Sequence, residues 1–194
     1  MSIAWRTVLL ILVQIAVLLG MIGMKQWTLD TGTPVVLETA PVDPRSLFSG
    51  DYVRLGYTIS NLRLDQLGGD REFKRHDRIY VALQTGTPYA MPVAIYHQMP
   101  AARAGQVVIR GEVEHMGSEF WNPRTQNIEK DVRNVLVRYG IENYYVPEGT
   151  GRALERPAGN AKIAVRVAVD RSGTAGILGI LVNGEERYQQ SLLY

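Results

Sequence analysis

Residues 162–193 read KIAVRVAVDRSGTAGILGILVNGEERYQQSLL, and this stretch decides the fold class. Two apolar runs rich in β-branched residues, 162–169 and 174–182, flank a polar turn and therefore predict a β-hairpin. Asn183-Gly184 follows, and this pair favours a two-residue hairpin turn because both positions of a type I′ turn need a positive φ. A further strand over 185–193 is expected to close this C-terminal unit.

Strand patterns of the same kind recur toward the N-terminus. We expect strands over residues 35–38, 52–59, 78–85, 89–97, 106–115 and 132–141. Within 52–59, the alternation of side chains predicts one face that is apolar enough to face a core, formed by Val53, Leu55, Tyr57 and Ile59.

The stretches between these strands are polar. Residues 62–74 and 117–131 are expected to be connections, the first with at most one helical turn. No crossover helix of ten or more residues is visible, as a parallel sheet would require. The fold class expected is therefore mainly β, either an antiparallel sandwich or a partly closed barrel.

One apolar segment precedes the strands. Residues 7–24 read TVLLILVQIAVLLGMIGM and carry no charge, which is close to the shortest length that spans a hydrocarbon core of about 30 Å. A cleaved signal peptide would need small residues at a cleavage site, and the residues after Met24 do not offer them. A buried core helix would show a polar face, which is missing here. We therefore expect one N-terminal transmembrane helix in contact with the lipid bilayer.

This anchor divides the chain into two parts. Residues 1–27 are expected to be the membrane anchor, and residues 28–194 an extracytoplasmic β-rich domain. Arg6 lies before the span and Lys25 after it, so that, with the N-terminal amine, the distribution of positive charge slightly favours a cytoplasmic N-terminus.

The composition excludes several classes of function. The chain has no cysteine, which removes disulfides, thiolate zinc sites and cysteine nucleophiles. Its 21 Lys and Arg against 19 Asp and Glu, with no basic run, argue against nucleic acid as a partner. The three histidines share no metal-ligand spacing, and no phosphate-binding loop motif is present. We expect no metal, no cofactor and no catalytic residue.

Two motifs carry the most specific information. Residues 50–57 read GDYVRLGY and fit the pattern G-D-Y-x-x-L-x-Y; they follow VDPRSLF at 42–48. Residues 138–151 read RYGIENYYVPEGTG. Together these stretches resemble the bacterial GDYXXLXY family, over residues 34–184 of the chain.

The resemblance implies a location and a kind of partner. Proteins similar to this one look like small envelope proteins with one N-terminal span, often found alongside multi-pass membrane proteins, and the resemblance implies no particular activity. On this basis we expect a signal anchor in the bacterial inner membrane, with the C-terminal domain in the periplasm.

Two interpretations of the motif residues stay open. Tyrosine and arginine are enriched at binding hot spots, and loops held by a rigid sheet are common binding sites. Tyrosine is equally a good strand former, and Asp after Gly is usual in a turn. The candidate ligand- or partner-binding residues are Arg45, Asp51, Tyr52, Arg54, Arg138, Glu142, Tyr144, Tyr145 and Glu148. All of these except Tyr52 and Tyr144 are expected to converge on one polar cleft.

Two functions follow from these alternatives. The first is a non-enzymatic accessory or binding subunit that contacts a multi-pass membrane protein through the loop after Arg138. The second is a binder or hydrolase of cell-envelope glycan, such as peptidoglycan, that uses the carboxylates of Glu142 and Glu148.

Overall fold

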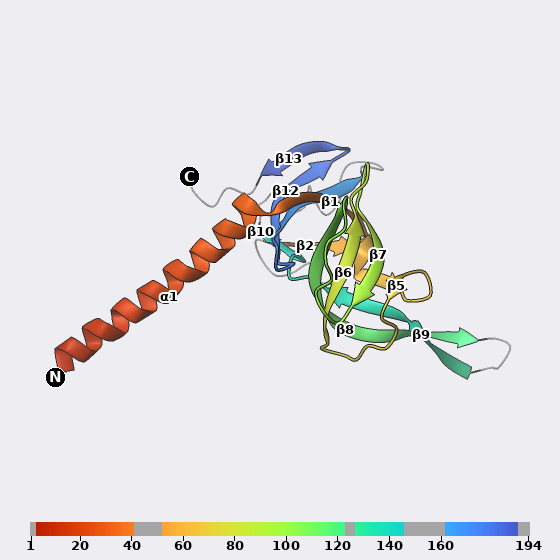
Figure 1. Cartoon of the computed structure of the whole chain (residues 1–194), viewed down its shortest axis with the longest axis horizontal. Helices are drawn as coiled ribbons and strands as arrows, with labels where there is room; N and C mark the ends of the chain where they lie inside the picture. The colour runs from red at the N-terminus through yellow and green to blue at the C-terminus, as the bar shows by residue number, and fades with distance from the viewer. Residues whose placement is uncertain (1–2, 41–51, 123–126, 146–161, 190–194) are drawn as a thin grey trace.

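The computed structural model describes residues 3–40, 52–122, 127–145 and 162–189, and it is mainly β after one long N-terminal helix (Figure 1). The predicted fold class is therefore confirmed. The helix is α1 (Ile3–Thr31). The strands are β1 (Thr33–Ala40), β2 (Tyr52–Arg54), β3 (Gly56–Tyr57), β4 (Asn61–Arg63), β5 (Gly68–Gly69), β6 (Arg78–Gln84), β7 (Met91–Tyr96), β8 (Gln106–Asn122), β9 (Asn127–Arg138), β10 (Asn143–Tyr145), β11 (Ile163–Val169), β12 (Ala175–Val182) and β13 (Glu185–Gln189).

The strands form two larger sheets and one short pair. One sheet has the order β13-β12-β11-β1-β3, the other has the order β4-β9-β8-β6-β7-β5, and β10 pairs with β2. Figure 1 shows the six-stranded sheet curled round the centre of the domain. Neighbouring strands are antiparallel except β5 and β7, where Gly68 lies opposite Ala94 in a parallel pair. The backbone amide of Ala90 donates to the carbonyl of Val36 at 2.9 Å and so ties the second sheet to β1.

The core lies between these sheets, and the alternation of side chains along the strands builds it. Leu37 of β1, Val81 of β6 and Val165 of β11 are all fully buried. Their neighbours along each strand point to the opposite face, as the period of two requires. Full burial of a side chain of this size contributes about 1.5–3 kcal/mol. The hydrophobic effect along these three strands therefore holds the two sheets together.

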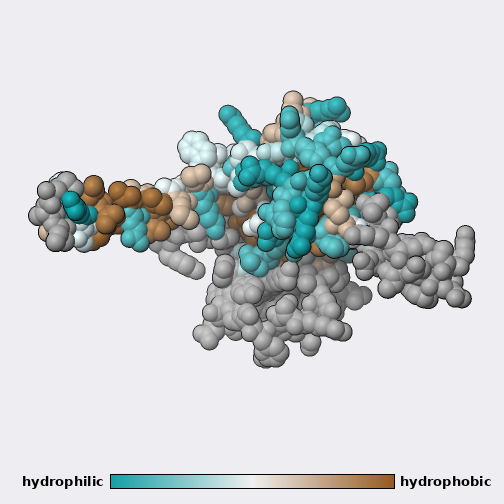
Figure 2. All heavy atoms as spheres, turned by 90° about the horizontal axis from the view of Figure 1, so that it is seen from below, coloured by the Kyte–Doolittle hydropathy of each residue, from teal (hydrophilic) through white to brown (hydrophobic). Residues whose placement is uncertain are grey.

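Helix α1 is long and apolar enough, by length and composition, to cross a membrane. None of its most apolar window is buried against the domain, and Figure 2 shows its hydrophobic side chains in brown beside a largely hydrophilic face of the domain. The predicted span, 7–24, lies inside the helix. The helix continues to Thr31, four residues beyond the expected end of the anchor at 27, because its last turn packs on β11 and β12.

Three sequence-based expectations about local structure were wrong. Residues 117–131 are not only a connection, because β8 and β9 continue pairing as far as Asn122 and Asn127. Main-chain hydrogen bonds suffice for such a polar ribbon, which projects away from the domain in Figure 1. The strand expected over 52–59 is broken into β2, β3 and a 3-10 turn, Thr58–Ser60. The connection expected over 62–74 contains parts of β4 and β5.

Candidate functional site

The two sequence motifs lie side by side, because β2 from the first motif pairs with β10 from the second. In this antiparallel register Tyr52 lies opposite Tyr145, and Arg54 lies opposite Asn143. The backbone amide of Leu55 extends the pairing by donating to the carbonyl of Glu142 at 2.7 Å. Segments more than 80 residues apart in the sequence therefore form one local structure.

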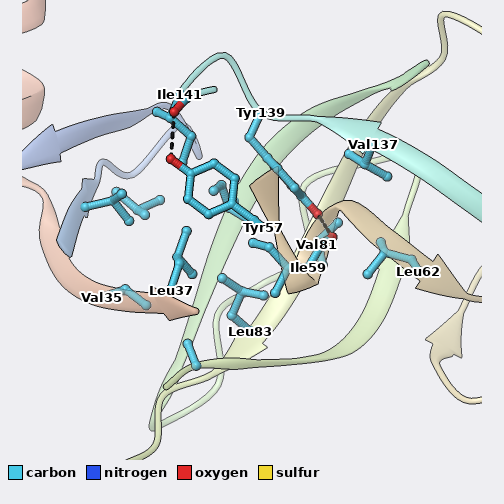
Figure 3. Close-up of a cluster of buried hydrophobic side chains, with 14 of the residues drawn as sticks. Val35, Leu37, Tyr57, Ile59, Leu62, Val81, Leu83, Val137, Tyr139 and Ile141 are labelled. Carbon is cyan, nitrogen blue, oxygen red and sulfur yellow. Dashed lines mark hydrogen bonds between the residues drawn. The ribbon is translucent and has the colours of Figure 1, made fainter. Parts of the chain in front are cut away.

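A reciprocal pair of tyrosine hydrogen bonds joins the two motifs (Figure 3). The Tyr57 hydroxyl donates to the carbonyl of Ile141 at 2.6 Å. The Tyr139 hydroxyl donates to the carbonyl of Ile59 at 2.7 Å. Each tyrosine thus bonds the isoleucine that lies two positions after the other tyrosine. Burial raises the pKa of both tyrosines, with a further contribution from the charge of Glu142, so both hydroxyls stay protonated and donate.

Several motif positions serve packing. Leu55 and Tyr57, the leucine and last tyrosine of the first motif, are 6% and 2% exposed. Tyr144 of the second motif is also buried in the core, although it was a candidate for binding. The alternation of side chains predicted this for Leu55 and Tyr57. It did not do so for Tyr144, because the sequence did not show where β9 ends and β10 begins.

The carboxylate of Glu142 closes the turn between β9 and β10. One oxygen accepts the backbone amide of Tyr139 at 2.6 Å, and the other accepts that of Gly140 at 2.9 Å. Gly140 has a φ of 81°, which favours glycine because it has no Cβ. Both oxygens of Glu142 therefore bind the backbone of the motif itself.

Arg138 remains accessible at the end of β9. Its guanidinium lies 3.6 Å from a carboxylate oxygen of Glu112, and the other oxygen of Glu112 lies 2.9 Å from Nδ1 of His76. The hydrogen bond from His76 lowers the pKa of Glu112, helped by the charge of Arg138. An exposed ion pair of this kind contributes little to stability because water screens it, so Arg138 can exchange it for another partner at little cost.

For the remaining candidate residues the structure gives either the backbone position alone or no position. Tyr52, Arg54 and Tyr145 are located by their backbones in β2 and β10. Arg45, Asp51 and Glu148 lie outside the described residues. The polar cleft expected from seven residues therefore stays a prediction.

A second feature, which sequence reasoning missed, is the junction between α1 and the domain. The buried hydroxyl of Thr28 donates to Oδ2 of Asp170 at 2.8 Å. Oδ1 of Asp170 accepts the amides of Ser172 and Thr174 and the hydroxyl of Ser172. The sequence predicts the turn at 170–173, but a partner 142 residues away leaves no local signal.

Small residues let the helix end approach the sheet. A Cβ added at Gly32 would lie 2.9 Å from the Cβ of Ala168, and one added at Gly176 would lie 2.6 Å from a methyl of Leu29. The helix end therefore packs on β11 and β12 as closely as glycine allows.

Next to this junction, beside the C-terminal part of the apolar segment of α1, a hollow of about 980 Å³ separates α1 from the domain. Gly20, Gly23 and Trp27 line it from the helix, and Arg110 and Gly140 line it from the domain. Since Gly140 belongs to the second motif, the motif turn and the apolar part of the helix face the same space. Within the described residues, no cluster of three His, Asp or Glu side chains is arranged to hold a metal ion.

We expect Thr28→Val to lower the free energy of unfolding by about 1 kcal/mol, because it removes one hydrogen-bond donor from a carboxylate that solvent still reaches. Burial raises the pKa of Asp170, but the hydrogen bonds from Ser172, Thr28 and Thr174 outweigh it and leave the pKa below its usual value. Because the pKa of Asp170 is lower in the folded chain than in the unfolded chain, ionised Asp170 stabilises the fold at any pH above its unfolded pKa of about 3.9. This contribution is lost as the pH falls through the lower pKa of Asp170 in the folded chain. Urea unfolding of the full chain in detergent at neutral pH and below pH 4 measures both effects. Thr31→Val is the control, because its hydroxyl bonds only within the helix; an equal loss in both variants would contradict the account.

Comparison with known proteins gives one finding. A family model described as GDYXXLXY protein matches residues 14–180. No curated protein and no solved structure matches the chain significantly.

Proposed function

We propose that this chain, which belongs to the GDYXXLXY family, is a membrane-anchored, non-enzymatic accessory or binding subunit of a multi-pass membrane protein. The contact is made by the surface of the paired motif strands β2 and β10, together with Arg138 at the end of β9. We call these three elements the motif surface.

One observation carries this proposal. Gly140 of the second motif and Gly23 of α1 line the same hollow, so the motif turn lies beside the outer end of the apolar helix. A partner that contacts the motif surface must therefore reach the level of the membrane surface. Multi-pass membrane proteins present loops and helix ends at this level.

The chemistry of the motif surface also supports a protein partner. Arg138 is exposed, and its only ion pair within the described residues is the long contact with Glu112. Tyr52 and Tyr145 lie opposite each other on an adjacent strand pair. Arginine and tyrosine carry much of the binding energy of protein interfaces, and here they are held on paired strands that the buried tyrosines fix.

The proposal includes a location. The apolar helix anchors the chain in a bacterial inner membrane, with the N-terminus in the cytoplasm and the β-rich domain, residues 28–194, in the periplasm. The charges of Arg6 and Lys25 support this orientation only slightly, and the long domain after the span is translocated largely regardless of its charge.

The glycan-hydrolase alternative gains no support from the described residues. Both oxygens of the Glu142 carboxylate accept backbone amides, so this group holds a turn instead of facing a substrate. A general acid needs a raised pKa and a position within reach of the scissile bond. The other proposed carboxylate, Glu148, lies outside the described residues.

The proposal is tested by purifying the tagged full-length chain from native membranes in a mild detergent. We expect an integral membrane protein to co-purify stoichiometrically. Tyr145→Ala and Arg138→Ala should each weaken its binding by about 2 kcal/mol, or roughly 30-fold, as expected for hot-spot residues. Quantitative mass spectrometry of the bound fraction measures the loss.

Matched variants separate binding from folding. Tyr89→Ala and Arg103→Ala remove the same residue types elsewhere on the domain and should leave the partner bound. The proposal would be contradicted if no membrane protein co-purified with the wild-type chain. It would also be contradicted if all four variants lost the partner to the same extent.

A further inference from the structure

We propose that the hollow between α1 and the domain binds the head group of an anionic phospholipid. This inference rests on the proposed membrane anchoring and adds a ligand to it. We call this space the junction hollow; it is the cavity of about 980 Å³ described above.

The helix wall of the junction hollow is apolar and lacks side chains at two positions. Gly20, Gly23, Met24 and Trp27 lie on this wall. A Cβ added at Gly20 or Gly23 would meet no atom within 4 Å, so the space beside both glycines is open. Residues three, four and seven apart share one face of a helix, and this wall therefore continues the surface of the apolar span.

The domain wall is polar, and the lining of the hollow as a whole carries a net positive charge. Arg110 and, from the helix, Lys25 supply two cations to the lining, whereas Asp170 is its only acidic residue among those described. Four hydrogen bonds from Thr28, Ser172 and Thr174 occupy both oxygens of the Asp170 carboxylate. Arg110 forms no ion pair with any described carboxylate, so its guanidinium can bind an anion.

The position of the junction hollow along the helix matches the head-group layer. The uncharged segment 7–24 is about 27 Å long at 1.5 Å per residue, close to the hydrocarbon thickness of about 30 Å. Gly20 to Thr28 extends about 12 Å along the axis and crosses the end of this segment. The hollow therefore begins among acyl chains and ends among head groups, which form a layer of several ångströms on each side.

An anionic phospholipid fits both walls at once. Its phosphate and negative head group meet Arg110 and Lys25, and the start of its acyl chains meets Met24 and the open space beside Gly23. Arginine is well suited to this contact because its guanidinium binds phosphate in a bidentate way. A transmembrane helix of another protein would fill the apolar half but would leave the two cations without a counter-charge.

The test uses the full chain reconstituted into nanodiscs of phosphatidylcholine with and without phosphatidylglycerol. After gentle extraction into detergent, native mass spectrometry counts the lipids that stay bound. We expect the wild-type chain to retain one phosphatidylglycerol in preference to phosphatidylcholine. Arg110→Gln should lower this retention about tenfold, the loss of one charge-assisted interaction. Gly23→Leu should displace the lipid by filling the space, while the open surroundings of Gly23 keep the fold intact.

Two matched variants sharpen the outcome. Arg103→Gln removes an arginine outside the lining, and Ala16→Leu places a leucine on the same helix face one turn before the lining. Both variants should retain the lipid. The proposal would be overturned if the wild-type chain retained phosphatidylglycerol and phosphatidylcholine equally. It would also be overturned if Arg110→Gln retained as much phosphatidylglycerol as the wild type. Loss in Ala16→Leu equal to that in Gly23→Leu would overturn it in favour of a partner helix. Incorporation of the chain into nanodiscs is measured before extraction, and a chain that does not insert would overturn the membrane anchoring itself.

Discussion

Replacement of Tyr57 or Tyr139 by alanine is expected to lower the free energy of unfolding by about 3–5 kcal/mol, which is the range for loss of a buried aromatic ring. Both side chains are buried, and each hydroxyl bonds a carbonyl of the other motif. Small domains are stable by only about 5–15 kcal/mol, so either change removes a large part of the stability. Urea unfolding of the full chain in detergent micelles, followed by circular dichroism, measures the loss.

The phenylalanine variants isolate the hydroxyl groups. Tyr57→Phe and Tyr139→Phe should each cost about 1–3 kcal/mol, because each leaves a buried carbonyl without its donor. The two hydrogen bonds link the same pair of segments, so the double variant should depart from additivity by about 0.5 kcal/mol or more.

Two half-buried tyrosines, Tyr80 and Tyr96, provide the control for the buried pair. Tyr80→Phe and Tyr96→Phe remove hydroxyls from partly exposed positions and should change the stability by less than about 0.5 kcal/mol. If Tyr57→Phe and Tyr139→Phe behaved like these controls, the reciprocal pair would not be what holds the two motifs together.

Gly32→Val is expected to separate the membrane helix from the domain. A Cβ at this position would lie 2.5 Å from the Thr28 carbonyl oxygen, 2.9 Å from the Cβ of Ala168 and 3.0 Å from the amide nitrogen of Val169. Two of these contacts are with backbone atoms, which do not move aside easily. Overpacking of this kind costs about 1–3 kcal/mol, and a valine adds two methyl groups beyond the Cβ. The strain is relieved if the helix end leaves β11.

The absence of native cysteine makes this movement measurable. Spin labels at Lys25→Cys and Arg171→Cys report the distance between the helix and the turn after β11. We expect a narrow distance distribution in the otherwise wild-type chain and a broad one after Gly32→Val. Gly86→Val is the matched control, because a Cβ there meets only the Tyr89 carbonyl oxygen at an ordinary 3.4 Å. A distribution that stays narrow in both variants would show that the helix end does not depend on close packing at Gly32.

The sequence predicted the elements whose signals are local. Alternating β-branched residues and Asn183-Gly184 predicted the hairpins of β11, β12 and β13, and the structure has Asn183 and Gly184 at φ of 54° and 85°. The uncharged run at 7–24 predicted the apolar helix for the same reason. In each case the pattern and the structure depend on neighbouring residues only.

Features that depend on distant segments could not be predicted. The pairing of β2 with β10 and the bond from Thr28 to Asp170 join residues about 90 and 142 positions apart. The ribbon of β8 and β9 beyond the domain was missed because its polar side chains give no burial pattern, although its backbone pairs regularly. Tyr144 is a candidate for binding from the composition of its motif, but the structure buries its side chain in the core. The composition of a motif does not show which face of a strand each tyrosine takes.

These features explain what the described positions of the family motif contribute physically. Leu55 and Tyr57 fill the core, and Tyr57 and Tyr139 fasten the first motif to the second. The result is a surface on hydrogen-bonded strands beside the apolar helix, with Arg138 exposed at its edge. Rigid support of this kind lets a small surface bind without losing much conformational entropy.

Site-specific photo-crosslinking from position 145 tests directly whether the motif surface contacts an integral membrane protein. A photoreactive phenylalanine analogue replaces Tyr145 in the full-length chain in native membranes, and a second sample carries it at Tyr96, which lies on β7 outside the motif surface. We expect a discrete adduct with an integral membrane protein from position 145 and none from position 96. No adduct from position 145, or the same adducts from both positions, would contradict it.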